Sequence, residues 1–91
     1  MTSRATELRD TVDLMNSDDY KKRFAAEYIQ AKVRYGKLHE MVAKYEDGTL
    51  DFKPSCSIDL LREQGGHMCN YIRCLEIRAE LEGIDLDRIE L

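Results

Sequence analysis

The stretch YKKRFAAEYIQAKVRYGKLHEMVAKY, Tyr20–Tyr45, decides the fold that the sequence predicts. Its apolar and aromatic residues recur at steps of four and three, the spacing of one packed face of an α-helix: they are Phe24, Tyr28, Ala31, Tyr35, Leu38, Val42 and Tyr45. A single internal glycine, Gly36, costs such a helix only about 1 kcal/mol. We expect one long basic helix over residues 18–46, ended by the turn-forming pair Asp47-Gly48.

The same stretch carries a charge opposite to that of the remaining chain. It holds seven of the fourteen lysines and arginines and two acids, a net +5 within a total of −4, and four of the five tyrosines. A basic helix with aromatic rings suits a small anionic ligand with flat rings. The acidic total disfavours non-specific binding to duplex nucleic acid, which requires neutralising many phosphates.

Two further helices flank this one. Leu8, Val12 and Met15 predict an N-terminal helix within residues 1–16, with Thr2 or Ser3 available as its cap. After a loop in which Leu50 and Phe52 are expected to pack back, a C-terminal helix is expected over 57–82, capped by Ser55 or Ser57 and ended near Gly83. Its packed face comprises Leu61, Met68, Ile72, Leu75 and Ala79.

The predicted fold is therefore all-α. It is a single helical domain, residues 1–91, with a short N-terminal helix and two long antiparallel helices that form a helical hairpin and assemble through helix packing. The remaining segment, 83–91, is acidic, and we expect either an extended arm or a frayed end.

Several function classes have no support in the sequence. No apolar run approaches the roughly 20 residues of a membrane span, and the N-terminus lacks a signal-peptide core. The three cysteines are odd in number and form no C-x-x-C pair, which favours a reduced cytoplasmic protein with Cys74 as core material rather than a metal site. No spacing assembles catalytic residues, so we expect no enzyme and no cofactor.

The first candidate binding site is an edge of the long basic helix. At 100° per residue, Arg23, Glu27 and Arg34 fall within about 40° of one another, and Tyr20 precedes Arg23 by about one turn. Arginines there can hold phosphates while a tyrosine stacks on a base. The alternative is that these side chains only form surface salt bridges and cover the core.

The second candidate is the segment Gln64, Gly65, Gly66 and His67 in the C-terminal helix. Exposed backbone beside an amide and an imidazole can hold a phosphate or a base edge. Two mid-helix glycines cost roughly 1–2 kcal/mol, so either the helix breaks there or another backbone approaches closely. Simple close packing of two helices is the alternative to a ligand site.

An ordered set of residues resembles a known family. Tyr20-Lys-Lys-Arg23-Phe24, Glu27, Arg34, Leu38 and Met41-Val42 are similar to the first long helix of the small phage anti-CBASS cyclic-nucleotide sponges. Leu60-Leu61, Gln64, Met68, Tyr71, Leu75 and Arg78 resemble their C-terminal helix, in the same order. The resemblance covers roughly residues 18 to 80.

The resemblance implies a phage protein that sequesters cyclic oligonucleotide signals in the host cytoplasm without cleaving them. Family members form dimer-based hexamers, with dinucleotide pockets between paired subunits and cyclic trinucleotide sites near the threefold axes. The matching dinucleotide contacts are Tyr20 and Arg34, and the trinucleotide sites point to Gln64–His67. The longer N-terminal extension, the glycine pair, the TLDFKPSCS connection and an arginine at a lysine-like position are departures that bear on the ligand.

A second hypothesis is a helical adaptor without a small-molecule ligand, which binds an acidic host protein through its basic helix. The two hypotheses predict different stoichiometries. A self-assembled hexamer favours the sponge, whereas a monomer that assembles only with a host protein favours the adaptor.

Overall fold

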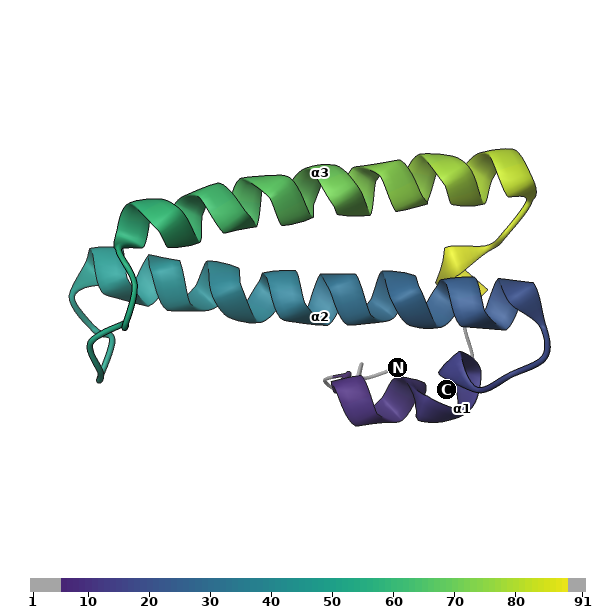
Figure 1. Ribbon diagram of the computed structural model, residues 1–91, viewed down its shortest axis with the longest axis horizontal. Coiled ribbons are helices and arrows are strands. Elements are labelled where there is room, and N and C mark those ends of the chain that lie inside the picture. Colours follow the sequence, from purple (N-terminus) through teal and green to yellow (C-terminus); the bar gives the residue numbers. More distant parts are fainter. Residues whose placement is uncertain (1–5, 89–91) are drawn as a thin grey trace.

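Two long helices dominate the structure. In the computed structural model, which describes residues 6–88, α2 spans Tyr20–Asp47 and α3 spans Ile58–Glu82. They lie side by side in opposite directions, joined by the loop at residues 48–57 (Figure 1). No strand occurs within residues 6–88, which confirms the all-α fold class.

Side chains at the helix ends explain where α2 and α3 begin and stop. The Asp19 carboxylate accepts a hydrogen bond from the Lys21 amide, and the Ser57 hydroxyl accepts one from the Leu60 amide. Gly48 and Gly83 follow the two helices with φ of 76° and 71°, the left-handed conformation in which a side chain is unfavourable. The ends at Gly48 and Gly83 and the cap at Ser57, one of the two serines considered, were predicted from the sequence and are confirmed.

A short N-terminal segment packs on the opposite side of α2 from α3 (Figure 1). It consists of the 3₁₀-helix η1, Leu8–Thr11, and the single-turn α1, Val12–Met15. Thr11 is fully buried, and its hydroxyl donates to the Leu8 carbonyl at 2.7 Å and accepts from Gln30 Nε2 at 2.8 Å. The expected caps Thr2 and Ser3 lie outside the described residues, and within the described part the first turn is instead closed by Glu7.

The core lies toward the end of the hairpin that is remote from the loop. Its buried cluster consists of Phe24, Ala31, Ile72, Leu75 and Ala79, with Tyr28, Tyr35, Ile84 and Leu86 packed against it. In the loop-proximal half of the described hairpin, Leu61 is the one buried residue. Burial is therefore uneven along α2 and α3.

The segment after α3 is neither an extended arm nor a frayed end over residues 83–88. Gly83 reverses the chain, the Ile84 amide donates to the Ala79 carbonyl at 2.8 Å, and the 3₁₀-helix η2, Leu86–Arg88, follows. Ile84 and Leu86 then reach the core cluster. The two apolar residues within an acidic segment explain this docking, because burial of their side chains favours the packed conformation.

Three other expectations differ from the structure. Cys74 is exposed rather than part of the core, and Cys56 and Cys69 are exposed as well; all three thiols are free. Tyr45, at the end of the predicted stripe, is also exposed. Leu50 is half-buried, but Phe52 remains exposed, so the loop packs back only in part.

Candidate functional site

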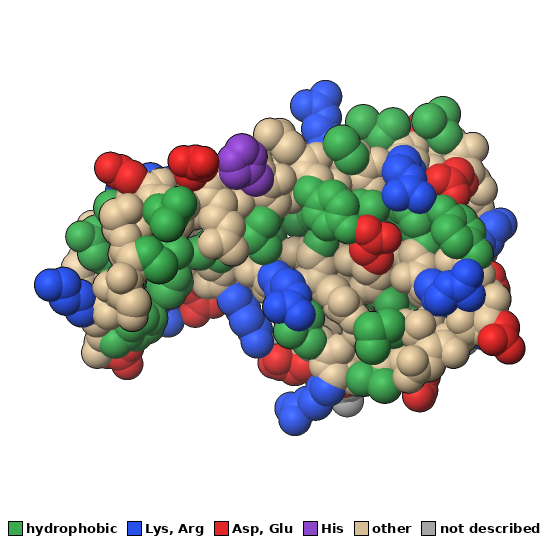
Figure 2. Space-filling model, viewed as in Figure 1, with side chains coloured by type: hydrophobic (Ala, Val, Ile, Leu, Met, Phe, Trp, Pro, Cys, Tyr) green, Lys and Arg blue, Asp and Glu red, His purple; other side chains and the backbone are tan. Residues whose placement is uncertain are grey.

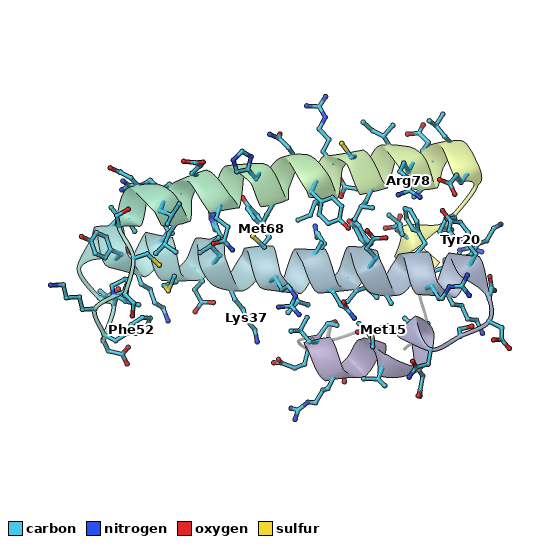
Figure 3. All side chains as sticks on the ribbon, in the orientation of Figure 1. Met15, Tyr20, Lys37, Phe52, Met68 and Arg78 are labelled. Carbon is cyan, nitrogen blue, oxygen red and sulfur yellow. The ribbon has the colours of Figure 1, made fainter. Side chains whose placement is uncertain are left out.

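Tyr20 lies at the centre of a polar network between the start of α2 and the end of α3. Its hydroxyl accepts a hydrogen bond from Arg78 Nη2 at 2.8 Å and donates one to Glu82 Oε1 at 2.9 Å. Arg78 Nε in turn lies 3.3 Å from Glu82 Oε2. Tyr20 and Arg78 occupy the same end of the hairpin on facing helices (Figure 3).

An aromatic contact continues this network toward the core. The guanidinium carbon of Arg78 lies 4.9 Å from the centre of the Phe24 ring, within the range of a cation–π interaction. The Phe24 ring is 6.2 Å from that of Tyr20. Burial lowers the pKa of Arg78, but the hydrogen bond to Glu82 and the nearby oxygens of Tyr20 and Glu82 outweigh it and raise that pKa above its ordinary value.

The predicted edge residues of α2 are not gathered around Tyr20. Arg23 Nη1 donates to the Ser17 carbonyl at 2.9 Å, and Glu27 accepts a hydrogen bond from the Tyr71 hydroxyl. Arg34 is exposed and makes no hydrogen bond or ion pair with any residue in 6–88. Fourteen residues separate Arg34 from Tyr20, which is a rise of about 21 Å along the helix.

The Gln64–His67 segment lies toward the opposite end of the hairpin, close to the loop. His67 Nε2 is 3.5 Å from the Glu63 carboxylate, and Gln64 makes a long 3.7 Å contact with the Met68 sulfur. All four residues of the segment belong to one continuous helix, so the helix break considered from the sequence is absent. Because this segment lies near the loop and Tyr20 lies at the other end of the hairpin, the two predicted sites are far apart within one chain.

The close backbone approach proposed for the glycine pair is also absent within one chain. A Cβ atom built on Gly65 would lie 3.8 Å from Leu38 Cδ2, an ordinary contact, and one built on Gly66 would meet nothing within 4 Å. A helix break and a close backbone approach, the two structures expected for this pair, are thus both wrong for the isolated chain. The helix accommodates the glycines because hydrogen bonds along α3 continue on both sides of them.

Comparison with known proteins identifies the family to which the chain belongs. The Sequestin family matches residues 18–81, which include all of α2 and nearly all of α3. The chain belongs to the Sequestin family. Sequestins are phage sponges that sequester cyclic nucleotides, in agreement with the resemblance drawn from the sequence. Neither a curated protein nor a solved structure matches the chain.

Sequestin membership makes this a ligand-sequestering protein. Arg78, which sequence analysis left out of the candidate site, is the residue that the structure adds there. In a helical hairpin that turns at about residue 51, position 20 lies opposite about residue 82. The position of the predicted loop could therefore have indicated that Tyr20 lies near Arg78 and Glu82.

The surface of this Sequestin in the view of Figure 2 mixes hydrophobic patches with single charges of both signs. No group of three or more metal-ligating side chains occurs among residues 6–88. No helix in that range is long and apolar enough to cross a membrane.

Proposed function

We propose that this protein is a phage anti-defence protein that binds cyclic di- and trinucleotide second messengers in the host cytoplasm and holds them without cleavage. Sequestering these signals would block CBASS-type immunity. The observation that supports this proposal best is Tyr20, a residue 46% exposed, with the Arg78 guanidinium hydrogen-bonded to its hydroxyl. An aromatic face beside a planar cation matches a ligand that alternates bases and phosphates.

The roles of the individual residues follow from this geometry. Tyr20 offers a ring face on which a base stacks. Arg78 near the end of α3 and Arg23 near the start of α2 lie at the same end of the hairpin, where an oxygen of a neighbouring residue holds each guanidinium, and in this proposal they neutralise phosphates. Glu27 fixes Tyr71 on α3 rather than binding the ligand directly.

Arg34 requires a second copy of the chain in this proposal. The rise of about 21 Å between Arg34 and Tyr20 exceeds what a compact cyclic dinucleotide spans. We therefore expect Arg34 of one subunit to complete the pocket that Tyr20 of another begins, within a dimer-based hexamer. The Gln64–His67 segment, at the other end of α3, is free to form the separate trinucleotide site.

Calorimetric titration with cyclic dinucleotides and cyclic trinucleotides tests the proposal. We expect both to release heat and to be recovered intact, with a linear dinucleotide binding at least about tenfold more weakly because it must be ordered on binding. Absence of heat with every cyclic nucleotide would contradict the sponge, and a monomer in light scattering would then favour the adaptor.

A pair of arginine variants separates specific from general electrostatic effects. Arg34→Ala should weaken cyclic dinucleotide binding by about 10- to 100-fold, the usual range for losing a charged hydrogen bond. Arg73→Ala removes the same charge from an exposed position of α3 and should leave the affinity unchanged. Equal losses in both variants would show that only the overall charge matters.

A further inference from the structure

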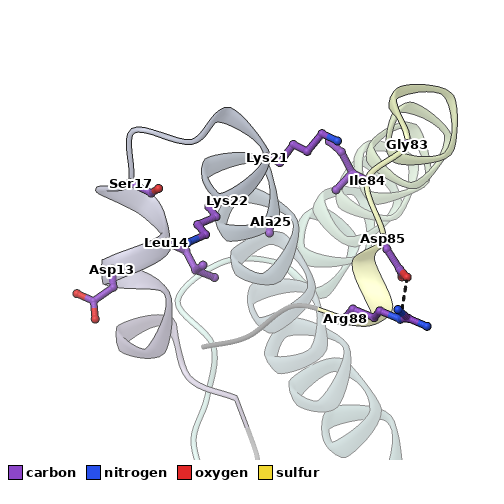
Figure 4. Close-up of a pocket in the computed structure, with 10 residues that line it drawn as sticks. All are labelled: Asp13, Leu14, Ser17, Lys21, Lys22, Ala25, Gly83, Ile84, Asp85 and Arg88. Carbon is purple, nitrogen blue, oxygen red and sulfur yellow. Dashed lines mark ion pairs between the residues drawn. The ribbon is translucent and has the colours of Figure 1, made fainter.

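A groove lies beside the start of α2, away from the Gln64–His67 segment. Its volume is about 690 Å³, within the range of small-molecule sites. Figure 4 shows residues of the N-terminal segment, the first turns of α2 and the chain after α3 around it. The lining residues are Asp13, Leu14, Ser17, Lys21, Lys22, Ala25, Gly83, Ile84, Asp85 and Arg88.

Most of this lining lies outside the part of the chain that matches the Sequestin family. The match covers residues 18–81, whereas two walls of the groove come from residues 13–17 and 83–88. The family match therefore covers only the part of the groove that α2 contributes, which is Lys21, Lys22 and Ala25. The walls are held in place by burial of Leu14 on one side and by the packing of Ile84 on the other.

The charges of the lining favour an anion although the whole chain is acidic. The lining holds the cations Lys21, Lys22 and Arg88 and the acids Asp13 and Asp85, which gives it one excess positive charge. Asp85 is 3.4 Å from Arg88 and is thereby neutralised. Neither Lys21 nor Lys22 has an ion-pair partner among residues 6–88, and the Asp13 carboxylate points away from both lysines in Figure 4.

The base of the groove is apolar. Leu14 and Ala25 are almost completely buried yet border the groove, and Ile84 borders it from the segment after α3. Apolar surface flanked by two cations without partners suits a ligand that joins a flat or apolar body to an anionic group. A free inorganic anion would use only the lysines.

We propose that this groove is a second binding site for a small phosphorylated ligand with a planar body, of the class of linear nucleoside monophosphates. Lys22, whose ammonium group points toward Leu14 in Figure 4, binds the phosphate, and the Lys21 ammonium group, which points toward Ile84, adds a second positive charge. The base or sugar lies on Leu14, Ala25 and Ile84. Arg88 stays paired with Asp85 and takes no part in binding the phosphate. The proposal does not depend on the cyclic nucleotide site at Tyr20.

Nuclear magnetic resonance titration with adenosine 5′-monophosphate tests this assignment. We expect saturable shifts of the amides of Leu14, Lys22 and Ile84. Adenosine, which lacks the phosphate, and inorganic phosphate, which lacks the body, should each bind at least about tenfold more weakly, the loss of about 1.4 kcal/mol. No saturable shift at these amides, or equal binding of adenosine, would overturn the proposal.

Two charge variants of matched design complete the test. The double variant Lys21→Gln/Lys22→Gln should weaken monophosphate binding at least about tenfold while keeping helicity, because glutamine and lysine have similar helix propensity. Lys53→Gln removes an exposed loop lysine outside the groove and should have no effect. Unchanged monophosphate binding in the double variant would overturn the site. Cyclic dinucleotide binding by the double variant should remain intact, so that failure of one site is distinguished from failure of the other.

Discussion

The Tyr20 hydroxyl has both of its hydrogen-bonding roles filled in the free protein. It accepts from Arg78 and donates to Glu82, and these two residues are also paired with each other. The ring is therefore oriented before any ligand arrives. An oriented aromatic face reduces the conformational entropy that binding must remove, which favours tight capture.

Arg78→Gln should weaken cyclic dinucleotide binding by about tenfold or more, because it removes a phosphate-binding fork and the support of Tyr20 together. Calorimetry measures the affinity, and circular dichroism checks that α3 remains helical. Arg73→Gln is the matched control, since Arg73 is exposed on the same helix. An affinity equal to that of the unmodified protein would exclude Arg78 from the site.

Tyr28 provides a pH dependence at the residue scale. Burial, the 2.7 Å hydrogen bond to Glu76 and the charges of Glu76 and Asp87 raise the pKa of Tyr28 to about 12 from 10.0. The folded state thus favours the protonated phenol. Its contribution to stability is complete below pH 10 and is lost as the pH rises toward 12.

Ultraviolet titration at high pH should therefore show a tyrosine ionisation at a pH of about 12. Tyr28→Phe should remove this late step, and Glu76→Gln should move it to lower pH because the negative neighbour is gone. A late step that persists in Tyr28→Phe would assign the raised pKa to another tyrosine.

At the scale of the helices, α3 contains glycines of two different kinds. Gly66 lies within the helix with open space where a Cβ would be, whereas Gly83 ends the helix at φ 71°. Gly66→Ala should raise the free energy of unfolding by about 1 kcal/mol through helix propensity. Gly83→Ala should lower it by roughly 1 kcal/mol, because an L-residue is strained at positive φ.

Denaturant unfolding of the two variants measures both effects with the same substitution. A loss of stability or of assembly in Gly66→Ala would show that a second subunit or a ligand occupies the space beside this glycine in the assembled protein. That result would support the interpretation that another backbone approaches the glycine pair closely in the assembled protein.

The helices were more predictable than the contacts between them. Ser57, Gly48 and Gly83 act within one turn of their own positions, so sequence patterns identified the ends that they form. The pairing of Tyr20 with Arg78 depends instead on how α2 and α3 register across 58 residues of chain, and helical periodicity carries no information on that register. Ile84 was missed for a similar reason, because two apolar residues in an acidic segment show no period.

At the scale of the whole molecule, α3 has apolar side chains that the single chain leaves exposed. Ile77 and Leu81 lie about 40° apart on the side of α3 that faces away from the core cluster, and Leu60 and Tyr71 are exposed on its flank. Leu81 is 81% exposed. A face of this kind on a small domain is consistent with the proposed homo-oligomer.

If folding and assembly are coupled, the melting temperature should rise with protein concentration by mass action. Calorimetric scans over a 100-fold range of protein concentration test this expectation. Such a range changes the apparent stability of a coupled assembly by about 2.7 kcal/mol. Leu81→Glu should lower the oligomer size in light scattering and remove the concentration dependence, whereas Glu80→Gln should do neither. A concentration-independent melting temperature in the unmodified protein would argue against a coupled hexamer.

The uneven core has a kinetic consequence. Near the loop, α2 and α3 are held mainly by contacts of short sequence separation such as Arg62 Nη2 to Glu46 at 2.6 Å, with little buried apolar surface. Local opening should therefore begin at the loop, since few buried contacts resist it there. Amide hydrogen exchange should be fast in residues 40–47 and 58–64 and slowest around Ala31 and Leu75. The Tyr20 end of the hairpin would then stay folded while the end near the loop opens and closes locally.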